Sequence, residues 1–177
     1  MVNAKDGPTE KECHMYRRLI LVISAMFLSM CMASALTPVE ELVPKYGDVK
    51  GARNITVRGA RMALARPVLR TYPVAPIADF VEDLAILKLE RASEQVRQDF
   101  EAELSSSLEG YQYCGKHLSK DGGIVDVYIL LSSPEAASQM VVFNPEICAL
   151  NILNGVFPVE ILLTLKPVSS SEPQDSE

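Results

Sequence analysis

The sequence predicts an α+β fold: a mostly antiparallel sheet of about five to six strands, covered on one face by a long amphipathic helix. Two observations carry this prediction. Apolar residues recur at every fourth position within residues 93–108, which is helical spacing, and strand-like segments joined by turns fill the chain from Tyr111 onward. Neighbouring strands joined by short turns pair antiparallel, so the second half of the chain should form most of the sheet.

The first elements are short. Thr37 stands before a proline and two acidic residues, so we expect a helix with Thr37 as its N-cap. Residues 54–58 alternate in polarity and contain β-branched side chains, which predicts a strand. Residues 59–65 have room for one or two helical turns before Pro67, and further prolines then indicate a loop.

A strand and a helix follow with clearer patterns. Residues 84–89 are predominantly apolar and predict a strand. Ser93 can cap a helix that runs to about Leu108 and ends before Gly110. The apolar stripe of this helix comprises Val96, Phe100, Leu104 and Leu108. Such a stripe indicates core packing, so we expect this helix to cover the sheet.

The C-terminal half predicts four strands, over residues 111–118, 124–131, 137–143 and 147–153. The continuous apolar character of residues 124–131 is typical of a central strand buried on both faces. Asn154-Gly155 should break the chain. Residues 158–165 are then either a short helix opened by Pro158 or a last strand.

Residues 1–35 have the pattern of a polar leader followed by a cleaved signal peptide. Basic residues at 16–18 precede an apolar run over residues 19–32, and Ala33-Ser34-Ala35 follow. This order of basic, apolar and small residues predicts export with processing after Ala35, hence a periplasmic or secreted protein with no membrane span in its mature form.

Two questions about this segment stay open. Residues 1–14 are polar and charged, so Met15 would be a better start for a signal peptide. Cys31 allows the alternative of lipidation, which would give an outer-membrane lipoprotein, although Met30 departs from the small residue expected before a lipidated cysteine.

What remains is one domain by length, over residues 36–166, followed by a Ser-, Pro- and acid-rich tail over residues 167–177 that we expect to be disordered. The formal net charge of the chain is −6, which argues against a nucleic-acid partner. One interval is an exception, since five arginines occur in residues 53–70 with no acid between them: Arg53, Arg58, Arg61, Arg66 and Arg70. They form a candidate anion-binding site for phosphate or an anionic lipid surface if they converge, or a solvated face if they pair with acids of the same chain.

Cys114 and Cys148 are the cysteines that survive processing. In an oxidising compartment they could form a disulfide. Two buried free thiols are equally compatible with the sequence, because free cysteine packs as a small apolar residue.

The chain contains the succession Lys45-Tyr46, Val57-Arg58, Leu84 to Leu89, Glu90-Arg91-Ala92-Ser93, Gly110-Tyr111, Asn144-Pro145, Cys148-Ala149-Leu150 and Asn154-Gly155. In this succession the chain resembles the DUF4252 family, small exported proteins found mainly in Bacteroidetes. The resemblance extends over roughly residues 39–165. It implies an exported α+β domain in the cell envelope, and it brings no established activity with it.

The sequence offers little for catalysis, so we expect no cofactor, no metal site and no catalytic residue. His117 is the only histidine after residue 35, and a pairing with Cys114 is disfavoured because residues an odd number apart on a strand face opposite sides. Glu82-Asp83 are adjacent carboxylates and should point apart. The prediction is a non-enzymatic binding or structural module whose partner is an unknown envelope protein or surface. The alternative is a small periplasmic hydrolase with an unrecognised carboxylate site.

Overall fold

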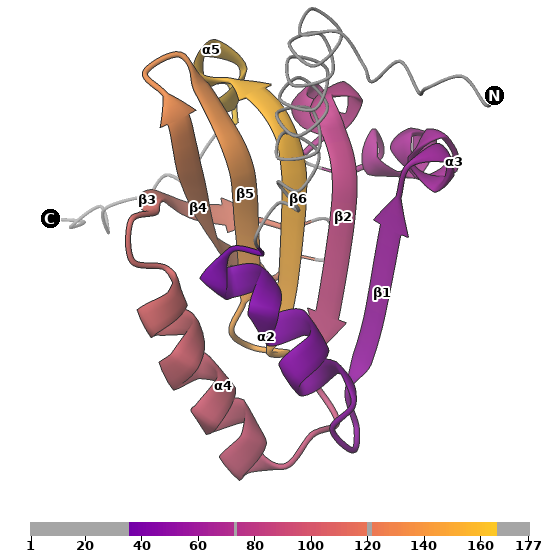
Figure 1. Ribbon diagram of the computed structural model, residues 1–177, viewed down its shortest axis with the longest axis vertical. Coiled ribbons are helices and arrows are strands. Elements are labelled where there is room, and N and C mark those ends of the chain that lie inside the picture. The colour runs from indigo at the N-terminus through magenta and orange to yellow at the C-terminus, as the bar shows by residue number, and fades with distance from the viewer. Residues whose placement is uncertain (1–35, 73, 120–121, 166–177) are drawn as a thin grey trace, which may run out of the picture. The chain divides into compact units, whose positions relative to one another are not determined.

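The computed structural model describes residues 36–72, 74–119 and 122–165, and the elements within them belong to one unit that begins at Thr37. Its centre is a six-stranded sheet with the order β1-β2-β6-β5-β4-β3 (Figure 1). Every pairing is antiparallel, which confirms the mixed α+β class and its antiparallel sheet. The strands are β1 (Arg53–Arg58), β2 (Val81–Lys88), β3 (Gln112–Leu118), β4 (Ile124–Ser133), β5 (Ala136–Asn144) and β6 (Ala149–Pro158). The helices are α2 (Pro38–Gly47), α3 (Ala60–Leu69), the 3-10 helix η1 (Ala75–Phe80), α4 (Glu94–Ser107) and α5 (Val159–Leu162).

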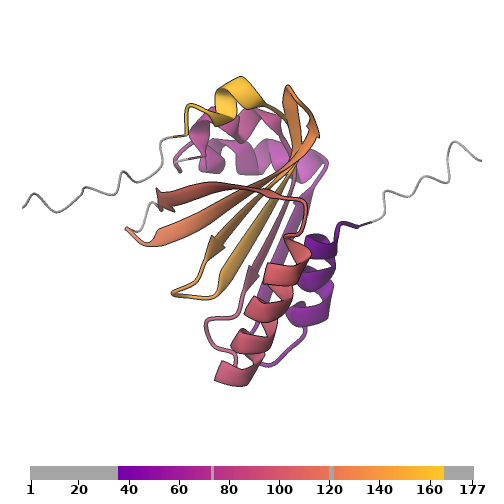
Figure 2. The same cartoon turned by 90° about the vertical axis from the view of Figure 1, so that its left-hand side faces the viewer.

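The sheet is covered on both faces by different groups of helices (Figure 2). On one face, α2 and α4 pack with side chains of β2, β5 and β6 around Phe100, which is fully buried. On the other face, α3, η1 and α5 contribute Met62, Ile77 and Leu162 to a second cluster around Phe157. We call these the α2–α4 face and the α3 face.

The predicted long helix that covers one face of the sheet by itself is not seen. The helices are short, and α4 is 14 residues long with only Phe100 and Leu104 fully buried. Val96 and Leu108, the ends of its apolar stripe, are partly buried. Because this single stripe cannot cover a six-stranded sheet, α2 shares the face with α4, and the opposite face has its own helices.

The start of α2 follows the sequence prediction. Thr37 is its N-cap and forms a capping box with Glu40, in which each residue binds the other's backbone. The helix continues through Pro44 to Gly47, because Val43 and Tyr46 are buried in the core and hold its last turn. In the same way α3 continues through Pro67, so the predicted helix end at that proline is wrong.

Asn154-Gly155 does not break the chain, because β6 runs through both residues to Pro158. Gly155 lies directly against β2, and a Cβ there would come within 2.0 Å of the Phe80 carbonyl oxygen. The glycine therefore serves close packing rather than a turn. After β6, the short helix α5 forms instead of a last strand.

The strand over residues 124–131, which the sequence predicts to be central, is not one of the two central strands. β6 and β5 are the central pair, whereas β4 is next to the edge strand β3. The continuous apolar character of β4 therefore predicted that this strand lies inside the sheet and not at its edge. It did not predict which strands are central, because the strand order depends on contacts between segments that are distant in the chain.

Candidate functional site

The structure disperses the five arginines of residues 53–70. Arg53 and Arg58 stand at the two ends of the edge strand β1, five positions apart, and so on opposite faces of the sheet. The Arg58 Nε lies 4.0 Å from Asp83 Oδ2, and Arg70 forms an exposed ion pair with Asp79 at 2.6 Å. These acids belong to η1 and β2, so the arginines neither converge on one cleft nor pair with the acids of α4.

The remaining two arginines differ from each other. Arg66 is partly buried and one of its Nη atoms donates to the Val81 carbonyl oxygen at 3.3 Å, which ties α3 to β2. Arg61 is exposed and has no hydrogen-bond or ion-pair partner within residues 36–72, 74–119 and 122–165.

The outward face of α3 is an exposed apolar surface. The exposed residues along this face are apolar: Ala60, Ala63, Leu64, Pro67 and Val68, which we call the α3 patch. Leu64 is 80% exposed and Val68 is 56% exposed. A surface helix ordinarily turns polar residues to water, whereas α3 is apolar on its inner face at Met62 as well.

The arginines of this segment flank the α3 patch. At 100° per residue the patch occupies about 140° of the helix, with Arg61 just beyond one edge and Arg70 beyond the other. There is no acidic residue in α3. Sequence reading missed this surface because it treated the segment as one or two turns ending at Pro67, which is too short to show a face.

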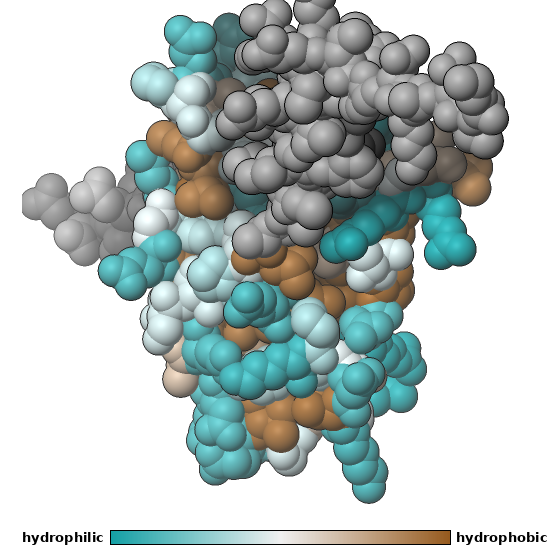
Figure 3. All heavy atoms as spheres, in the orientation of Figure 1, coloured by the Kyte–Doolittle hydropathy of each residue, from teal (hydrophilic) through white to brown (hydrophobic). Residues whose placement is uncertain are grey.

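Other exposed apolar side chains lie on the same side of the sheet. Ile55 of β1 pairs with Ile86, which packs in the cluster of the α3 face, and Ile55 is 55% exposed. Leu163, directly after α5, is 80% exposed. In contrast, polar and charged residues cover much of α2 and α4 on the side seen in Figure 3.

A partly buried polar network around the buried Gln139 connects α2 to the centre of the sheet; we call it the Gln139 network. Gln139 on β5 is 3% exposed, accepts a hydrogen bond from the Tyr111 hydroxyl and donates to Asn154 Oδ1 at 2.7 Å. Asn154 Nδ2 in turn donates to Glu40 Oε1 at 2.7 Å, and the other Glu40 oxygen accepts from the Thr37 backbone N–H at 2.8 Å. Burial raises the pKa of Tyr111, so its hydroxyl stays a donor. Since the members satisfy one another, the network holds α2 in place.

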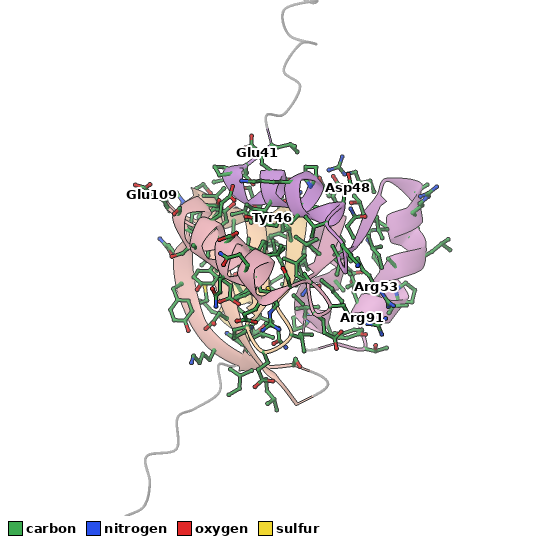
Figure 4. All side chains as sticks on the ribbon, turned by 90° about the horizontal axis from the view of Figure 1, so that it is seen from below. Glu41, Tyr46, Asp48, Arg53, Arg91 and Glu109 are labelled. Carbon is green, nitrogen blue, oxygen red and sulfur yellow. The ribbon has the colours of Figure 1, made fainter. Side chains whose placement is uncertain are left out.

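A second polar cluster joins α2 to α4, and Figure 4 places Tyr46 between these helices. The Tyr46 hydroxyl donates to Glu103 Oε2 at 2.8 Å, and Lys45 Nζ lies 2.6 Å from the same carboxylate. Burial and the neighbouring Glu103 raise the pKa of Tyr46 to about 12, and the hydrogen bond from Lys45 lowers the pKa of Glu103. The Tyr46 ring also packs edge-on against Phe100, so this cluster is part of the helix packing.

Cys114 and Cys148 are both free thiols, the first exposed on the edge strand β3 and the second fully buried. Cys114 sits at a bulge between Tyr113 and Gly115, where the alternation of β3 is interrupted. The rule that residues an odd number apart face opposite sides therefore does not hold between Cys114 and His117. The Cys114 Sγ contacts the backbone oxygen of Gln112, and the His117 Nε2 is buried without a hydrogen-bond partner in the described chain.

Within the described residues, no group of three or more histidine, cysteine, aspartate or glutamate side chains could hold a metal ion. None of the described helices combines the length and apolar character needed to cross a membrane. Cys31, Ala35 and the tail over residues 167–177 lie outside the described residues.

No protein-family model matches the chain, and neither a curated protein nor a solved structure matches it significantly. The resemblance to the DUF4252 family therefore stays a prediction.

Proposed function

We propose that this protein is an exported, non-enzymatic binding module of the cell envelope that docks onto its partner through the α3 patch. The observation that carries the proposal is a helix that is apolar on both faces, with Leu64 80% exposed at the centre of its outward side. A surface of this kind, with charged residues at its margins, marks an interaction site in a folded protein. Export is inferred from the order of basic, apolar and small residues in residues 16–35.

The exposed area is large enough to matter for binding. Fully burying a leucine or valine side chain contributes about 1.5–3 kcal/mol. Scaled by their exposures of 80% and 56%, Leu64 and Val68 together offer about 3 kcal/mol. That is a factor of about a hundred in affinity.

Export is tested by expressing the full chain in a bacterial cell, separating the compartments and determining the mass and N-terminal sequence of the product. Processing after Ala35 gives a soluble envelope protein that starts at Leu36. A lipid-modified product that starts at Cys31 would show that the protein is exported as a lipoprotein and not as a soluble protein. A cytoplasmic product that retains residues 15–35 contradicts export.

Docking is tested by incubating the processed protein with washed envelope membranes and measuring the bound fraction. We expect Leu64→Ser with Val68→Ser to remove most of the binding, because these changes delete the apolar contact and leave the core untouched. The matched control is Ile147→Ser, which changes an apolar residue that is 37% exposed in the turn between β5 and β6, at the other end of the sheet. Equal binding by the double variant and the parent protein would show that the α3 patch does not dock.

A further inference from the structure

We infer that the partner of the α3 patch is an anionic phospholipid surface, on which α3 lies in the plane of the headgroups. This inference rests on the proposed function and names the partner of the same site. It is carried by the arrangement of one apolar face between two arginines, in a segment that has no acid over residues 53–70.

The shape of α3 fits a membrane interface. A helix of ten residues is about 15 Å long, and such a helix binds with its apolar side about 5–10 Å into the boundary between headgroups and acyl chains. Leu64 and Val68, one turn apart, are the largest exposed apolar side chains on this side. Their neighbours Ala60, Ala63 and Pro67 add no polar atoms apart from the backbone.

The arginines stand where lipid phosphates would be. Arg61 borders the apolar side and has no partner in the described residues, so its guanidinium can bind a phosphate bidentately. Arg70 borders the other edge and forms an ion pair with Asp79. The side chains of Arg70 and Asp79 are 58% and 61% exposed. An exposed pair of this kind is weak, so a phosphate can compete for Arg70.

Arg66 has a different place in this arrangement. It is directed toward the sheet, where it donates to the Val81 carbonyl oxygen. Its contact holds the inner side of α3 and leaves the outer side to the membrane. Ile55 and Leu163 are exposed apolar residues on the same side of the sheet as α3.

Charge favours a lipid surface over a second copy of this chain as the partner of the α3 patch. In a second copy of this chain the α3 patch would meet an identical patch, where α3 has no acid for Arg61, and Asp79 at its margin is already paired with Arg70. A lipid surface combines a negative plane with an apolar interior directly beneath it. Each basic residue near such a surface adds to the attraction, which weakens with salt.

The experiment is flotation of the processed protein with vesicles of phosphatidylcholine alone or mixed with phosphatidylglycerol. We expect binding to the anionic vesicles, little binding to the neutral ones and a decrease with added salt. Leu64→Asp with Val68→Asp should weaken partitioning by about a hundredfold. Arg61→Ala should weaken it about fivefold, and Arg61→Lys should restore most of it.

The control for charge is Arg91→Ala (labelled in Figure 4), which removes an exposed arginine that follows β2. The adjoining end of β2 pairs with Arg53, at the end of β1 opposite to the one from which α3 continues. This variant should bind the vesicles like the parent protein. Circular dichroism of each variant establishes that it is folded. Equal partitioning to neutral and anionic vesicles, or equal loss with Arg91→Ala and Arg61→Ala, overturns the inference.

The same variants applied to envelope membranes separate the two proposals. If the α3 patch is needed for binding to envelope membranes but pure anionic vesicles are not bound, the docking proposal stands and the lipid inference is overturned. If neither preparation is bound, both are overturned. A dimer in sedimentation analysis that requires Leu64 and Val68 would identify a second copy as the occupant and would also overturn the lipid inference.

Discussion

Replacing Gln139 by leucine should lower the free energy of unfolding by about 3 kcal/mol, although leucine is apolar and of similar size. Gln139 is 3% exposed and holds together residues from α2, β6 and the segment before β3. The Gln139 network thus fixes the position of α2 relative to the sheet.

The magnitude follows from the groups that lose a partner. Without the Gln139 amide, Asn154 Oδ1 loses its donor at 2.7 Å, and the Tyr111 hydroxyl loses its acceptor. A buried polar group left unpaired costs about 1–3 kcal/mol, and two such groups cost about 4 kcal/mol at mid-range. The apolar side chain of leucine offsets about 1 kcal/mol of this.

The assay is urea unfolding followed by far-ultraviolet circular dichroism, with a shift of the midpoint at unchanged slope. Gln95→Leu on α4 is the matched control, because Gln95 is exposed and its amide donates to Asp99 Oδ1 at 2.8 Å, its one hydrogen bond within the described part of the chain. It should change stability by less than about 0.5 kcal/mol. A similarly small loss for Gln139→Leu would refute the reasoning that the network stabilises the fold.

The remaining predictions concern thiols, acid and the sheet edge. In the native protein a thiol reagent should modify Cys114 and leave Cys148 unmodified until unfolding, because Cys148 is fully buried and burial raises its pKa to about 11. Glu103→Gln should reduce the loss of stability in acid: the folded-state pKa of Glu103 is lowered, so its contribution is present above the ordinary glutamate pKa and is lost as the pH falls through the lower value. Arg53→Val with Arg58→Val should make the protein self-associate in size-exclusion chromatography, because these arginines would face each other between two copies of the edge strand β1.

Each of these has a result that would contradict it. Two thiols modified at equal rates in the native protein would show that Cys148 is accessible. An unchanged acid limb of the pH–stability curve for Glu103→Gln would mean that the carboxylate contributes nothing there. A double variant of β1 that stays monomeric, as Arg91→Val should, would show that the arginines do not protect the edge.

Local signals predicted most of the elements. The capping residues Thr37 and Ser93 begin α2 and α4 as expected, since an N-cap depends on the next three residues alone. The order of helices and strands was also readable, because each strand has its own apolar pattern. The strand order within the sheet was not, since it depends on pairings such as β2 with β6 that are distant in the chain.

The errors share one physical cause, which is that tertiary contacts override local preference. Gly155 follows an asparagine, a common turn pair, yet it lies in β6 because only glycine fits against the Phe80 carbonyl. Pro67 lies inside α3 and removes one helical hydrogen bond, which the burial of Met62 and Leu69 on the inner side compensates. The sequence did not predict the α3 patch, because the patch extends past Pro67, where the predicted helix ended.

Since the chain contains no tryptophan, a Leu64→Trp variant places a single fluorescent reporter in the centre of the α3 patch. On adding phosphatidylglycerol vesicles, its emission should shift to shorter wavelength, as for an indole leaving water, and phosphatidylcholine vesicles should leave it unchanged. The matched variant Ile147→Trp, at the other end of the sheet, should show no shift with either. An unshifted emission from Leu64→Trp on vesicles that bind the protein would contradict the claim that α3 is the surface that docks.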